Sequence, residues 1–158
     1  MPGRGKRSAG ILAYRQGAAG LEVFLVHPGG PFWARRDAGA WSIPKGEYAA
    51  EEPPLQAAQR ELLEETGQSV QGAFMQLTPL RQPGGKWVTA FAVETAALDP
   101  AKLRSNHFSL EWPPGSGSYR DFPEVDRAAW FALPEARTRM LAGQRALLDE
   151  LAARLGTA

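Results

Sequence analysis

The alternation of apolar and polar positions divides the chain into strand-like and helical segments. Two runs rich in β-branched and aromatic residues, 9–15 and 21–27, flank the glycine-containing segment 16–20 and predict two strands joined by a short loop. Further strand-like runs lie at 73–82, 86–95, 107–112 and 127–133. The segment 28–40 is too rich in Pro, Gly and charge for a regular element, and long loops of this kind often carry function.

Three helices are expected where apolar residues recur every three to four positions. The first spans 54–66, with a proline in its first turn and Gly67 just past its end, where glycine is favoured. Two more are expected at 134–141 and 143–155, and the second carries a leucine stripe typical of core packing. The segment 113–123 is expected to be a loop. Strands and helices mixed in this way predict an α/β (α+β) sandwich, a sheet covered by helices.

Composition favours one domain without disulfides. A chain of 158 residues can bury one core, so a single domain is expected over 1–158, with residues 1–7 as a flexible N-terminus. Lys+Arg 18 against Asp+Glu 17 argues against a protein that binds nucleic acid through bulk charge. The absence of cysteine excludes thiolate zinc sites, and no apolar run approaches the ~18 residues of a membrane span. We therefore expect a cytoplasmic protein without a membrane partner.

The predicted helix 54–66 concentrates negative charge near its end. Glu61, Glu64 and Glu65 share one face, because residues three and four apart on a helix are neighbours. Their repulsion, added to the helix dipole, costs about 1 kcal/mol unless a cation lies among them. Clustered carboxylate oxygens favour Mg²⁺, Mn²⁺ or Ca²⁺ over zinc.

The spacing around these glutamates resembles the Nudix box, G-x5-E-x7-R-E-U-x-E-E-x-G-U, in which U is a bulky apolar residue. Gly46, Glu52 and the run Arg60–Gly67 occupy its fixed positions. At roughly 6% usage per residue type, such a match arises by chance with a probability on the order of 10⁻⁹. The last U position is Gln68, which departs from the pattern and leaves the apolar contact after the box to Val70.

The resemblance to the Nudix family implies an α/β/α sandwich that hydrolyses a pyrophosphate bond in a nucleoside diphosphate linked to another moiety, with Mg²⁺ or Mn²⁺. It implies the metal ligands Glu61, Glu65, Glu64 and the carbonyl of Lys45. Glu64 is either a further ligand or the base that activates water. Arg60 and Glu52 are implied to orient Glu61, as metal ligands generally require.

The general base has several candidates. Many Nudix members take an acidic residue from a loop before the last strand, and the resemblance places Glu124 there, with Glu111 and the box glutamates as alternatives. The candidate catalytic residues are therefore Glu64, Arg60 and Glu124.

Lys45, Trp33 and Trp41 are the candidate substrate-binding residues, the lysine for a polyphosphate and the tryptophans for stacking a nucleobase. The segment 41–46 is similar to the W-x-x-P-K-G lead-in of diadenosine polyphosphate hydrolases, and "GAWSIPKGE", "EWPP" and "FPEVDRAAWF" together resemble a bacterial subgroup of predicted NTP pyrophosphohydrolases. The expected substrate is thus a dinucleoside polyphosphate or an NTP, with an RNA 5′ end as an alternative. A nucleotide-binding sensor without efficient hydrolysis and an interaction domain are the other functions considered. His27 is interpreted as structural.

Overall fold

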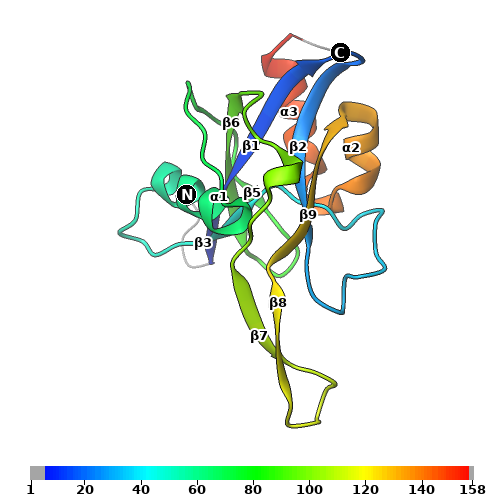
Figure 1. The fold of residues 1–158 in the computed structure, drawn as a ribbon. Coiled ribbons are helices and arrows are strands. Elements are labelled where there is room, and N and C mark those ends of the chain that lie inside the picture. Colours follow the sequence, from blue (N-terminus) through cyan, green and yellow to red (C-terminus); the bar gives the residue numbers. More distant parts are fainter. Residues whose placement is uncertain (1–5, 157–158) are drawn as a thin grey trace.

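A computed structural model describes residues 6–156 (Figure 1). The elements are β1 (Arg7–Gly17), β2 (Gly20–Pro28), β3 (Lys45–Glu47), α1 (Pro54–Thr66), β4 (Met75–Gln76), β5 (Leu80–Arg81), β6 (Trp87–Glu94), η1 (Pro100–Lys102), β7 (His107–Glu111), β8 (Tyr119–Pro123), β9 (Val125–Ala132), α2 (Leu133–Arg139), η2 (Ala142–Gln144) and α3 (Arg145–Arg154). Each predicted helix is present, with bounds within three residues of those expected.

The main sheet is mixed and has seven strands in the described residues, with the order β4-β6-β1-β2-β9 along its main path. β1 and β6 run parallel, whereas the other pairs are antiparallel. The short strand β3 pairs with the beginning of β1, where Gly46 lies opposite Ala9. This pairing fixes the segment just before α1 against the centre of the sheet.

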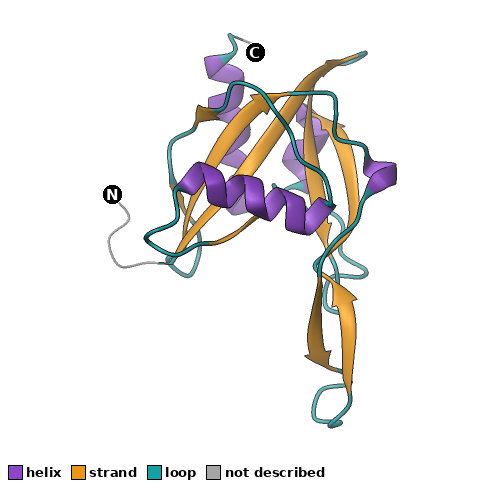
Figure 2. Cartoon of the chain, turned by 60° about the vertical axis from the view of Figure 1, so that its left-hand side comes forward, coloured by secondary structure: helices purple, strands orange, loops and turns teal. Residues whose placement is uncertain are grey.

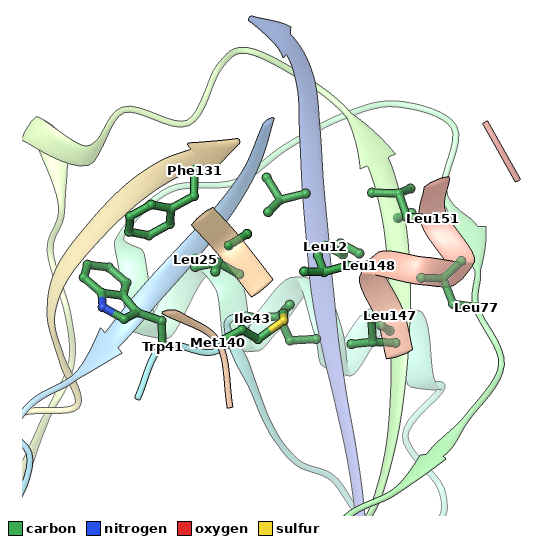
Figure 3. Packing of buried hydrophobic residues seen from close by; sticks show 14 of the residues in the cluster. Leu12, Leu25, Trp41, Ile43, Leu77, Phe131, Met140, Leu147, Leu148 and Leu151 are labelled. Carbon is green, nitrogen blue, oxygen red and sulfur yellow. The ribbon is translucent and has the colours of Figure 1, made fainter. Parts of the chain in front are cut away.

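Helices cover both faces of this sheet (Figure 2). Alternate residues of β1 point to opposite sides, so Ile11 joins the core beneath α1 while Leu12 joins the core beneath α2 and α3. Figure 3 shows the second core, in which the leucine stripe of α3 packs with residues of the sheet. That stripe consists of Leu147, Leu148 and Leu151. The α/β/α sandwich is therefore confirmed.

The ends of α1 follow the predicted sequence signals. Pro54 occupies the first turn, and Gly67 has φ +73° while its backbone N–H donates to the Leu63 carbonyl at 2.8 Å. Gln68 makes two hydrogen bonds with the backbone of Asp99, each of 2.9 Å. Val70 is buried in the core beneath α1. The residue that departs from the box pattern thus anchors a loop, and Val70 supplies the apolar contact as predicted.

Some predicted elements were wrong. The segment 113–123, expected to be a loop, contains the strand β8, which pairs with β7. The run 73–82 forms only the two-residue strands β4 and β5, separated by a stretch that contains Pro79. Arg7, expected in a flexible terminus, is the first residue of β1, and residues 1–5 lie outside the described range. Within residues 6–156, no helix is long and apolar enough to cross a membrane.

Candidate functional site

A hollow beside the C-terminal half of α1 brings the predicted acidic residues together. Glu61, Glu64 and Glu65 line it from the helix, and Glu124 lines it from the residue between β8 and β9. Lys45 lines it from β3. The remaining lining residues are Ser8, Gly46, Glu47, Lys86 and Asn106. The predicted metal, base and phosphate residues therefore share one site.

Arg60 holds the acidic cluster in place. Its Nη1 donates to Glu61 at 2.6 Å and to Glu64 at 3.3 Å, while its Nε donates to Glu52 at 2.9 Å. The hydrogen bond with Glu52 leads the interactions that raise the pKa of the Arg60 guanidinium, and in return Arg60 lowers the pKa of the Glu52 carboxyl. These are the contacts expected of residues that orient Glu61.

Gly46 of β3 packs closely against Glu61 of α1. A Cβ atom added at Gly46 would lie 2.0 Å from Oε1 and 2.1 Å from Cδ of Glu61. The carboxylate of Glu61 therefore occupies the space that any other residue type would fill at position 46. This close packing is a physical reason for the glycine that opens the box.

Glu65 is a half-buried carboxyl in an acidic neighbourhood. Burial, followed by the charge of Glu61, raises its pKa to about 8. Burial likewise raises the pKa of Glu61, although Arg60 opposes that shift. A cation among these groups would favour their ionised forms.

The donor set fits a hard divalent cation, since carboxylate oxygens crowd a space where ionisation is unfavourable without positive charge. Among residues 6–156, no three acidic or histidine side chains already converge on one point. Glu61 and Glu64 instead direct oxygens to Arg60. Glu61, Glu64, Glu65 and Lys45, the residues predicted to hold such an ion, all line the hollow.

Positive charge lines the same hollow. Burial first, and the Lys86 ammonium second, hold the pKa of Lys45 below its usual range. Lys86 Nζ is 2.8 Å from a carboxylate oxygen of Glu47. Two ammonium groups thus lie near the glutamates, where a polyphosphate would place its negative charge.

A second pocket adjoins the hollow and shares Lys45, Glu65 and Glu124 with it. Its other lining residues are Val26, Pro28, Trp33, Ala40, Ser42, Ile43, Val125 and Leu141. Trp33 thus lies where the prediction requires, on an apolar wall beside the acidic residues. An apolar pocket joined to a charged hollow suits a ligand with a flat base and a phosphate chain.

The prediction that Trp41 binds the substrate was wrong, because the structure places Trp41 in the core rather than in the pocket. It is only 3% exposed, and its ring packs edge-on against His27 and Phe131. Its Nε1 donates to Asp37 at 2.7 Å. Trp41 therefore anchors the 28–40 loop from beneath and has no exposed face for a nucleobase.

Glu111, the alternative base, also lies elsewhere. It accepts hydrogen bonds from the backbone N–H groups of Gly115 and Gly117, each of 3.0 Å. Glu111 therefore stabilises the turn between β7 and β8. Of the two candidates outside the box, Glu124 is the one in the hollow.

His27 is structural, as interpreted from the sequence. It is completely buried, its Nε2 donates to the Arg36 carbonyl at 2.6 Å, and its Nδ1 is 2.8 Å from Asp126. The ring therefore ties the 28–40 loop to β9. Sequence reasoning missed Asn106 and Ser8 as lining residues, since neither belongs to a recognisable motif.

The raised pKa of Glu65 predicts an unusual pH dependence for the metal-free protein. The protonated carboxyl contributes stability that is fully present below its ordinary value of 4.5 and is lost as the pH rises through about 8. Over this range the wild type should lose at least ~1 kcal/mol, or roughly 2–4 °C in melting temperature, relative to Glu65→Gln. Melting curves in chelator across this range measure the difference. Parallel curves for the two proteins would contradict it.

Comparison with known proteins identifies the family. The family model described as "NUDIX domain" matches residues 5–151. A search of curated proteins gives no match.

Solved structures of low sequence identity share the fold. C. elegans Ap4A hydrolase in a binary complex is 21% identical, with a TM-score of 0.66 over 94% of this chain and 98% of that chain. The NUDIX domain of Shewanella oneidensis NrtR complexed with ADP ribose is 18% identical, with a TM-score of 0.66 over 96% and 88%. A mutT/nudix family protein from Listeria innocua is 17% identical, with a TM-score of 0.62 over 96% and 94%.

The family model covers almost all of the described chain, and the glutamates of the box line one hollow in an α/β/α sandwich. The chain therefore belongs to the Nudix family.

Proposed function

We propose that the protein hydrolyses the pyrophosphate bridge of a dinucleoside polyphosphate or a nucleoside triphosphate, with Mg²⁺ held by Glu61, Glu64 and Glu65. The observation that carries the proposal is the single hollow in which these carboxylates face Lys45 and Glu124. Bound Mg²⁺ would neutralise the phosphate oxygens and acidify the attacking water.

The chain's own residues then divide the work. A water oxygen forms a bond to one phosphorus of the bridge, the bridging P–O bond breaks, and a carboxylate takes the water's proton. Glu124 is the base we favour, because it is exposed within the hollow and lines both the hollow and the adjoining pocket. Glu64 shares its oxygens with Arg60, which leaves it less free to accept a proton.

Lys45 is proposed to contact the phosphate chain, and Trp33 the first nucleobase. Lys45 lines both cavities. Its ammonium can therefore reach the phosphate chain of a nucleotide whose base lies against Trp33. A pKa held below the usual range by burial would rise again beside a phosphate, so binding the anion relieves an existing electrostatic cost. The W-x-x-P-K-G segment that carries Lys45 favours a dinucleoside polyphosphate within the substrate class.

A substrate panel tests the proposal. The purified protein is incubated with Mg²⁺ and diadenosine polyphosphates, normal and oxidised nucleoside triphosphates, ADP-ribose, nucleotide sugars and triphosphorylated RNA, and the products are separated by chromatography. We expect one preferred substrate, cleaved at a pyrophosphate bridge. Nucleotide-induced thermal stabilisation without turnover would instead identify a sensor that retains the fold without efficient hydrolysis.

A further inference from the structure

The strands β7 and β8 form an arm that projects from the body of the molecule (Figures 1 and 2). They pair with each other in a two-stranded sheet separate from the main sheet. The arm begins at Asn106 and ends at Glu124, both of which line the hollow. Asn106 N–H donates to the Glu64 carbonyl at 2.8 Å, and Glu124 N–H donates to the Asn106 carbonyl at 2.9 Å. The arm is therefore rooted in the catalytic site and extends outward from it.

One face of the arm is aromatic and meets the 28–40 loop. Phe108 and Phe122 lie opposite each other, with ring centroids 6.0 Å apart. Gly30 passes so close that an added Cβ would lie 3.1 Å from the Phe108 ring. Further out, the rings of Phe32 and Trp112 form an edge-to-face pair with centroids 5.4 Å apart. The loop and the arm thus touch at two points along the arm.

Phe32 is unusual because it is 61% exposed although it is held by Trp112. A phenylalanine in this state gains little from burial and keeps a π-face available to a ligand. Its chain neighbour Trp33 lines the pocket, and Pro28 and Glu124, at the roots of the loop and the arm, line the same pocket. The Phe32–Trp112 pair therefore lies beyond the pocket, on the two segments that form its rim.

Positive charge accompanies these rings. The guanidinium of Arg36 lies 5.5 Å from the Trp33 ring centroid, and that of Arg120 lies 5.9 Å from the Phe122 ring centroid. Aromatic faces interleaved with arginine suit a nucleobase attached to a phosphate chain. Trp112 lies six residues beyond Asn106, roughly 20 Å along an extended strand. A base stacked on Phe32 would therefore lie at the outer edge of the site, away from phosphates held in the hollow at the root of the arm.

The geometry points to a second base-binding site, in which Phe32, supported by Trp112, stacks on the nucleobase at the far end of a dinucleoside polyphosphate. This inference rests on the proposed function and narrows its substrate to molecules with two nucleosides. Stacking on an aromatic side chain is worth about 1–3 kcal/mol per base, which corresponds to a roughly 5- to 150-fold change in affinity. The site would therefore act on the KM for the two-base substrate.

The test compares a substrate that has two nucleosides with a substrate that has one. For each variant, kcat/KM is measured with Mg²⁺ for diadenosine tetraphosphate and for ATP, and the ratio of the two values is the readout. Phe32→Ala should lower this ratio about tenfold, mainly through the KM for diadenosine tetraphosphate. Phe32→Tyr, which keeps the ring, should retain the wild-type ratio, and Phe32→Leu, which keeps only apolar bulk, should not.

Tyr119→Ala is the matched control. Tyr119 is 69% exposed on the same arm, but it lies opposite Glu111 and so points to the face away from Trp112. Tyr119→Ala should therefore leave the ratio of the two kcat/KM values unchanged. A ratio that is unchanged in Phe32→Ala, in a protein that hydrolyses both substrates, would overturn the second base site alone. A wild type that hydrolyses neither substrate would overturn the proposed function and this inference together.

Discussion

Glu65→Gln is expected to lower Mg²⁺-dependent turnover about 10³-fold, a loss of about 4 kcal/mol of transition-state stabilisation. Glutamine keeps the shape of the side chain but removes the charge that would hold the ion. Because Glu65 is largely protonated near neutral pH in the metal-free protein, the neutral amide resembles its resting state. The variant should therefore melt no lower than the wild type in chelator at pH about 8. Initial rates and melting curves measure the two effects.

Glu51→Gln provides the control. Glu51 is an exposed glutamate that precedes α1 and does not line the hollow. It should retain the wild-type rate. Glu61→Gln should resemble Glu65→Gln in activity, because both carboxylates belong to the proposed ligand set. Near wild-type rates in both Glu61→Gln and Glu65→Gln, with unchanged circular dichroism spectra, would refute the metal assignment.

Gly46→Ala is expected to lower activity about 100-fold while changing the free energy of unfolding by less than ~1 kcal/mol. The new Cβ would lie 2.0 Å from Oε1 of Glu61, so the carboxylate must move aside. Side-chain rotation relieves this clash at small cost to the fold, but displacing a ligand by about 1 Å can cost 10²-fold in rate. Paired measurements of kcat and denaturant midpoint on the purified variant separate the two effects.

Gly143→Ala is the matched control, because its added Cβ meets nothing closer than 3.2 Å, at a ring carbon of Pro83, and neither residue lines the hollow. Both activity and stability should remain near wild type. If Gly46→Ala instead lost stability and activity in proportion, Gly46 would serve the fold rather than the position of Glu61. Full activity in Gly46→Ala would show that the Glu61 carboxylate need not occupy this space.

The helix and its acidic residues could be predicted because their signals are local. The 3.6-residue spacing, Pro54 at the start and Gly67 at the end fix α1 without reference to the rest of the chain. The fixed spacing of the glutamates then places them on one face of that helix. Glu124 could be placed near it only through the resemblance to the Nudix family, because the contact depends on how the chain returns at β9.

The arm and the position of Trp41 could not be predicted, because both depend on contacts between segments that are far apart in the sequence. β8 is exposed over much of its length and lacks a buried alternating face, so only its pairing with β7 makes it a strand. Trp41 lies in a segment rich in loop residues, which suggested exposure. Its burial depends on His27 and Phe131, which approach it from β2 and β9.

The most direct test of the central claim is hydrolysis of diadenosine tetraphosphate in ¹⁸O-labelled water, with Mg²⁺ and with chelator, followed by mass spectrometry of the products. We expect label in the phosphate of one product, in the Mg²⁺ sample only, and about 10³-fold slower incorporation of label with Glu65→Gln. Unlabelled phosphates in cleaved products, or equal cleavage in chelator, would contradict a metal-dependent attack of water on a pyrophosphate bridge.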